Sequence, residues 1–135
     1  MNAQRYLDEI VAPTIAEFEN DPLSVRRALL ACIVTFHTID YLGRQSLQKC
    51  RRESQDFTFV EKIANAAKHH ETDGQVPLRA EEVISRPPGF FDVCVLDLSR
   101  LDDPVGGITL AGQTGADVLR AVTGAAAFLR SKIGE

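Results

Sequence analysis

The sequence predicts a mainly α-helical bundle, with a small antiparallel β-hairpin placed before the C-terminal helix. Apolar residues recur every three or four positions over 3–71, which is the period of helices that pack on a core, and about five helical segments result. The stretch 90–98 instead alternates in steps of two, as a half-buried strand does. Residues 115–132 return to the helical period.

The length of 135 residues allows one domain with its own core. We therefore expect a single domain, 1–135, in which a helical core (3–71) is followed by a hairpin (90–111) and a C-terminal helix (115–132). The net charge of −4 excludes a general nucleic-acid-binding surface, although a local basic patch would still be compatible with it.

The three cysteines indicate a reducing, cytoplasmic compartment. Their number is odd and no CxxC spacing occurs, which argues against a disulfide framework and a zinc site. The N-terminus lacks the charged and apolar regions of a signal peptide. The longest apolar run is far shorter than the roughly 20 residues of a membrane-spanning helix, so no membrane association is expected.

The first two helices have clear boundaries in the sequence. Residues 3–20 read as one helix with a kink or joint at Pro13, because proline removes a backbone donor and clashes one turn back. Asp21 or Ser24 can cap the next helix, which should end at Gly43. This second helix is apolar on most sides, which is typical of a helix central to a core.

The middle of the chain is polar and then helical again. Residues 44–54 are basic and are expected to be helical, and Asp56 is the expected N-cap of a helix over 57–71. Residues 79–84 fit either a helical turn or the start of a strand. The strand at 90–98 should pair with a returning strand at 108–111, and the hairpin must pack on the helices because two strands alone are marginal.

The last helix is expected to begin at Thr114, with Asp117 three residues on in a capping-box arrangement, and to end at Gly134.

The helix over 57–71 carries the candidate functional residues. Asn65 and His69 lie four positions apart, so their side chains are neighbours on a face that should point away from the core. The residues expected on this outward face are Glu61, Lys62, Asn65, Lys68 and His69. His70 lies at the edge of the apolar face and is assigned to packing.

Two further features of this helix point to partners. Asn65 is unusual in a helix interior and could hydrogen-bond to His37 and Asp40, three residues apart near the end of the second helix. The small residues Ala64, Ala66 and Ala67 would let another helix approach closely, which favours a homodimer.

The run ANAAKH at 64–69 resembles the ANA-x-KH helix of small uncharacterised bacterial helical proteins. More distantly, the chain is similar over 23–71 to the HEPN superfamily of helical, usually dimeric domains. Many of those cleave RNA without a metal, using Arg, a polar residue that is often Asn, three further residues and His. Asn65 and His69 match that Asn and His, whereas Ala64 occupies the place of the Arg. Lys62 lacks the planar fork that Arg offers to a phosphate.

The resemblance implies a metal-independent endoribonuclease or a degenerate RNA-binding relative. His69 would then act as general base or acid on a ribose 2′-hydroxyl, and Asn65 would position the phosphate. Binding contacts would come from His37, Asp40 and Lys68, and from Arg51 and Arg52 through their charge.

Two other kinds of site find little support. A metal site from His37, Asp40 and His69 is chemically possible, but no HExxH or ExxH spacing accompanies it, so no metal is expected. No Walker A or GxGxxG pattern is present, so we expect no nucleotide cofactor. The leading hypothesis is an interaction or regulatory module that homodimerises through helix faces and has no catalysis of its own, and the HEPN-like ribonuclease is the alternative.

Overall fold

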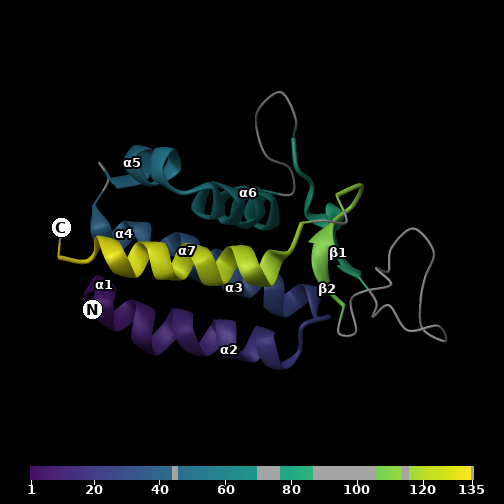
Figure 1. Ribbon diagram of the computed structural model, residues 1–135, viewed down its shortest axis with the longest axis horizontal. Coiled ribbons are helices and arrows are strands. Elements are labelled where there is room, and N and C mark those ends of the chain that lie inside the picture. Colours follow the sequence, from purple (N-terminus) through teal and green to yellow (C-terminus); the bar gives the residue numbers. More distant parts are fainter. Residues whose placement is uncertain (44–45, 70–76, 87–105, 114–115, 135) are drawn as a thin grey trace.

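The structure is a computed structural model of the chain, and it describes residues 1–43, 46–69, 77–86, 106–113 and 116–134. Four helices form a bundle, and a two-stranded sheet lies at one end of it (Figure 1). The four helices are α2 (Ala12–Asn20), α3 (Val25–His37), α6 (Gln55–His69) and α7 (Val118–Lys132). The predicted class is therefore confirmed. In the ranges given, no helix has the length and apolar character that crossing a bilayer requires.

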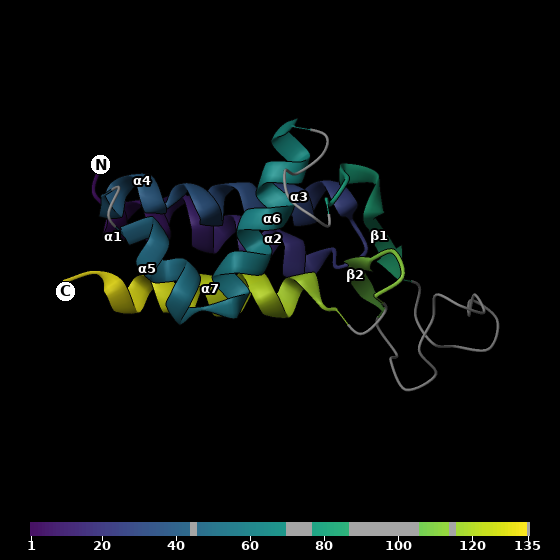
Figure 2. The ribbon, with the colours of Figure 1, turned by 90° about the horizontal axis from the view of Figure 1, so that it is seen from above.

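Each long helix packs on its neighbours around the core. The contacts join α2 to α3, α3 to α6, α6 to α7, and α7 back to α2. Figure 2 shows α6 lying across the bundle, with α7 on one side and α3 on the other. The main core is contributed by every one of these helices, with Phe18, Cys32, Ile63 and Val122 among its fully buried members.

The predicted joint at Pro13 is a wide helical turn. The π-helical turn η1 (Leu7–Val11) connects the short helix α1 (Ala3–Tyr6) to α2, and the Ala12 N–H bonds to the Leu7 carbonyl, five residues back. Proline at position 13 has no N–H to give, and the wide turn before it takes up the change in hydrogen-bond register.

The boundaries of the second helix follow the sequence closely. The Ser24 hydroxyl accepts the Arg27 N–H at 3.2 Å, so Ser24 is the N-cap. The helix is interrupted at Thr38, after which α4 (Ile39–Leu42) continues to Gly43. Gly43 has φ of +93°, a left-handed conformation that glycine adopts without steric cost, and it ends the helix as predicted.

The start of α6 differs from the prediction. The basic segment does form a helix, α5 (Ser46–Glu53), but Ser54 rather than Asp56 accepts the Phe57 N–H, at 3.1 Å. Asp56 instead lies against α7. A Cβ built on Gly124 would come within 2.2 Å of the Asp56 carboxylate, so glycine provides the space in which α6 and α7 approach.

Glu61 also contradicts the prediction, because it points inward. Its side chain is only 8% exposed, and Arg51 of α5 holds its carboxylate with two nitrogens. The Arg51 Nε donates to Oε2 at 2.9 Å, and Nη2 donates to Oε1. The hydrogen bonds to Glu61 also raise the pKa of Arg51. A carboxylate at an apolar boundary is stable when such charge-assisted bonds satisfy it.

The sheet forms from segments on either side of a long connection. Strand β1 (Val83–Arg86) pairs antiparallel with β2 (Gly107–Leu110), with Val83 opposite Leu110. The returning strand is thus confirmed, whereas the strand expected at 90–98 lies outside the described residues. The stretch 79–84 contains both predicted alternatives, since the 3₁₀ turn η2 (Ala80–Glu82) leads into β1.

The hairpin packs on the helices as expected, because Val83, Ile108 and Leu110 all belong to the main core. Helix α7 follows β2, and the Asp117 side chain caps it by accepting the Arg120 N–H at 3.3 Å. The helix therefore begins at Val118 and not at the expected Thr114, because Asp117 is extended and acts as the N-cap itself.

Substitutions at Arg51 and Glu61 test how much their ion pair contributes to holding α5 against α6. We predict that Arg51→Leu lowers the free energy of unfolding by about 1–3 kcal/mol, because it leaves the Glu61 carboxylate buried without its partner. Adding Glu61→Leu should recover most of that loss. Urea denaturation measures both effects. Arg52→Leu, at the exposed neighbouring arginine, is the matched control, and an equal cost for Arg51→Leu and Arg52→Leu would contradict the prediction.

Candidate functional site

Asn65 and His69 share the outward face of α6, as the sequence predicts. His69 is exposed at the last residue of the helix, and Asn65 is half-buried one turn earlier. Lys62 and Lys68 are both exposed, on the same side of the helix as Asn65 and His69. The group therefore combines an imidazole and an amide with two cations along α6 from its middle to its last residue. His70 lies outside the described residues.

His37 and Asp40 pair with each other. The His37 Nδ1 and the Asp40 Oδ2 are 3.0 Å apart, across the junction between α3 and α4. Both side chains remain substantially exposed. A carboxylate in this position orients the imidazole ring.

The structure does not bring these two pairs together. Helix α6 crosses α3 at a steep angle (Figure 2), and Phe36 contacts Phe57 with ring centroids 6.0 Å apart. His37 is therefore beside the first turn of α6. His69 lies at the other end of that helix, about 18 Å further along at 1.5 Å per residue.

The two arginines differ in their surroundings. Arg51 is committed to the Glu61 carboxylate, so contacting a phosphate would require it to leave a buried partner. Arg52 is exposed at the end of α5.

The alanines of α6 pack mostly against other helices of the same chain. Ala64 and Ala66 are buried in the monomer, and Ala67 is half-buried. The close helix approach that small residues permit thus serves the packing of α6 within the bundle.

The described residues contain no group of three or more His, Cys, Asp or Glu side chains that could hold a metal ion. Three residues are candidates for such a site in the sequence. His37 and Asp40 lie near the first turn of α6, whereas His69 is the last residue of that helix.

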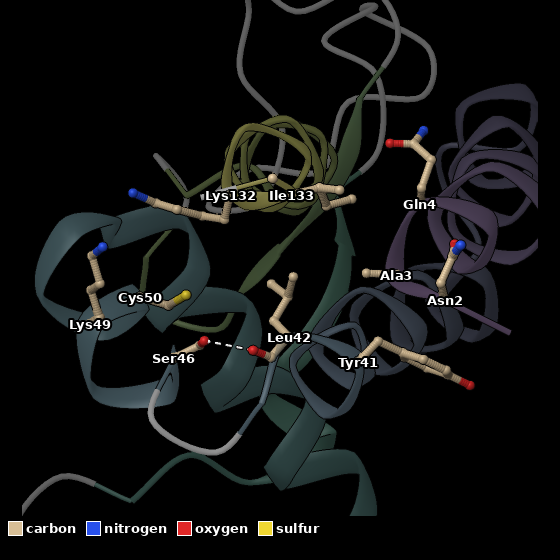
Figure 3. Close-up of a pocket in the computed structure, with 11 residues that line it drawn as sticks. Asn2, Ala3, Gln4, Tyr41, Leu42, Ser46, Lys49, Cys50, Lys132 and Ile133 are labelled. Carbon is tan, nitrogen blue, oxygen red and sulfur yellow. Dashed lines mark hydrogen bonds between the residues drawn. The ribbon is translucent and has the colours of Figure 1, made fainter.

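A cavity that the sequence did not reveal lies at the end of the bundle where both chain termini are found. Its volume is about 460 Å³, which is in the range of small-molecule pockets. Four separate segments form its walls, namely the first residues of the chain, α4, α5 and the end of α7 (Figure 3). No local sequence pattern could have indicated it, because the walls meet only in the folded chain.

One side of this bundle-end cavity is cationic. Lys49 of α5 and Lys132 of α7 lie on that side, together with Cys50 (Figure 3). The Lys132 ammonium is 2.5 Å from a carboxylate oxygen of Glu53, and it also lies 5.2 Å from the centre of the Phe128 ring. Lys132 holds the pKa of Glu53 below its usual value, and the charges of Lys49 and Arg52 act in the same direction.

The thiols of Cys50 and Cys32 have different environments. Cys50 is 2% exposed but lines the cavity, whereas Cys32 is enclosed by the main core. Burial raises the pKa of Cys32 to about 12, so almost none of it is thiolate at neutral pH.

No protein-family model matches the sequence, and no significant match to the chain is found among curated proteins or solved structures. The similarity to ANA-x-KH proteins and to the HEPN superfamily therefore stays a prediction.

The reactivity of Cys50 tests whether a small reagent can enter the cavity. We predict that iodoacetamide modifies Cys50 of the native protein several-fold faster than Cys32, because only Cys50 borders a space that the reagent can enter. Peptide-resolved mass spectrometry after timed alkylation measures the two rates separately. The urea-unfolded protein, in which both sites should react at similar rates, is the control. Equal rates in the native protein would show that the cavity does not admit the reagent.

Proposed function

We propose that the protein is an interaction module that forms homodimers through the outward face of α3 and α4, and that it has no catalysis of its own. The observation that carries the proposal is that α3 and α4 expose large apolar side chains on their outer side. Five residues define this surface, named here the α3 stripe: Arg26, Leu30, Ile33, His37 and Tyr41.

The α3 stripe exposes two large apolar side chains. Leu30 is 40% exposed and Tyr41 is 42% exposed, and Ile33 is half-buried between them. The outward face of α6, by contrast, carries Lys62 and His69. Exposed leucine and tyrosine side chains beside a half-buried isoleucine at helical spacing, with charged residues at the ends, are typical of a surface that a partner covers.

The charges of the stripe favour a second copy of the chain as that partner. Arg26 lies at one end and Asp40, beside His37, at the other, with Ile33 midway. A twofold axis at Ile33 would set two stripes antiparallel. Arg26 of one copy would then lie near Asp40 of the other, so opposite charges would meet at both ends of an apolar centre.

The oligomeric state tests this proposal. We expect the protein at about 100 µM to have twice the monomer mass of 14.8 kDa by light scattering, as a dimer of micromolar Kd would. Leu30→Glu should raise the dimer Kd at least about tenfold, because it places a carboxylate in the apolar centre. Thr123→Glu, on the exposed side of α7, is the matched control and should remain dimeric.

A monomer mass at that concentration would overturn the proposal. So would a dimer that Leu30→Glu and Thr123→Glu leave equally intact, because its interface would then lie elsewhere.

A second candidate function is RNA binding or metal-independent RNA cleavage at the end of α6. It is favoured by the common outward face of Asn65 and His69 and by the exposed cations Lys62 and Lys68 beside them. His69 would act as the general acid or base, and the lysines would attract the phosphate backbone.

Cleavage assays separate the two candidates. If the second holds, structured or single-stranded RNA should be cleaved in EDTA, and His69→Ala should reduce the rate by about 100-fold or more, as loss of a general acid or base does. His37→Ala, at the distant histidine, should leave the rate unchanged. An absence of cleavage by the wild-type protein would sink the enzymatic form, and RNA binding would then be measured by fluorescence anisotropy.

A further inference from the structure

We propose that the bundle-end cavity binds a small molecule with an anionic head, a carboxylate or a phosphate, on a short apolar body. The cavity is separate from the α6 residues discussed above, and it shares with the α3 stripe only Tyr41, which lines its edge. Its walls divide into a cationic side and an apolar middle, and these two features define the ligand class.

The cationic side determines the head group. Lys49 and Lys132 come from different helices and lie together over Cys50 (Figure 3). None of the described residues that line the cavity carries a carboxylate. The nearby carboxylate of Glu53 contacts Lys132 and is stabilised in its charged form by Lys132, Lys49 and Arg52. An acid is thus already stabilised beside this wall, and a second anion at the cavity mouth would meet the same cations.

The middle of the cavity determines the body of the ligand. Ala3, Leu42 and Ile133 present apolar side chains between the lysines and the far side, where Asn2 and Gln4 lie (Figure 3). Two of the polar side chains that line the cavity are hydrogen-bonded within the chain. The Ser46 hydroxyl donates to the Leu42 carbonyl at 3.0 Å, and the Asn2 side chain accepts the Arg5 N–H at 2.9 Å. Contact with an alkyl chain would leave these two hydrogen bonds intact.

Binding to such a site should depend on the head group. The probes are hexanoate, hexyl phosphate and hexanol, which share one alkyl chain and differ in charge. We expect one or both anions to bind at least about tenfold more tightly than hexanol by isothermal titration calorimetry. The tighter anion identifies the head as carboxylate or phosphate. Bound anion should also slow alkylation of Cys50 while leaving Cys32 unchanged, since only Cys50 lines the cavity.

Three substitutions test the role of charge. Lys49→Gln should weaken anion binding at least about tenfold, whereas Glu53→Gln should strengthen it because it removes a competing carboxylate. Lys62→Gln, at an exposed lysine on α6, is the matched control and should leave the affinity unchanged. The opposite signs at Lys49 and Glu53 separate a built site from a loss of folding, which would weaken binding in both variants.

The proposal is overturned if hexanol binds as tightly as the anions, or if none of the three probes binds to the wild-type protein. It is also overturned if Lys62→Gln weakens binding as much as Lys49→Gln does. Should Lys49→Gln fail to fold, Glu53→Gln and the protection of wild-type Cys50 still decide the outcome.

Discussion

The buried carboxylate of Glu61 and its partner Arg51 set the position of α5. This helix is short and strongly polar, and Cys50 is its buried residue. Apolar burial alone would hold such a helix weakly, because most of its side chains stay in water. The Arg51–Glu61 pair fixes α5 to α6, and the Glu53–Lys132 pair fixes its end to α7. The cavity wall formed by Lys49 and Cys50 belongs to α5, so its position depends on the attachment of α5 to α6.

A buried pair of this kind costs desolvation on both sides, so it contributes position more than net stability. Arg51 is partly exposed and retains some of its hydration, which reduces that cost. The small apolar cluster of Ile39, Cys50, Phe57 and Leu129 lies at the same end of the bundle and adds to the attachment. The bundle end is thus built from two kinds of interaction, namely ion pairs and a compact apolar group.

Helix α3 occupies the centre of the fold, and this position explains its composition. Its core side contacts α2, α6 and α7, which accounts for the buried Ala28, Ala31 and Cys32. The contacts within one chain leave Leu30 outward. Two buried hydroxyls of this region, on Thr35 and Thr38, have no hydrogen-bond partner among the described residues. Thr35 lies in the last turn of α3, and Thr38 lies between α3 and α4.

The elements set by local chemistry could be predicted from the sequence. Ser24, Gly43 and Pro13 act on the backbone next to them, through a side-chain cap, a left-handed turn and a missing donor. The outward position of Asn65 and His69 follows in the same way from the helical period of α6. The separation of His37 from His69 could not be predicted from the sequence, because it depends on which end of α6 packs beside the end of α3.

The sequence by itself thus determined the helical class, the boundaries of the second helix at Ser24 and Gly43, and the outward position of Asn65 and His69, since these depend on residues within a turn or two of one another. Only the tertiary structure decided the inward position of Glu61, the pairing of β2 with Val83–Arg86, and the cavity at the bundle end. Each of these depends on segments that are distant in the chain. A glutamate at Glu61 reads as exposed until α5 brings Arg51 to it, because the energy of a charge is set by what surrounds it in space.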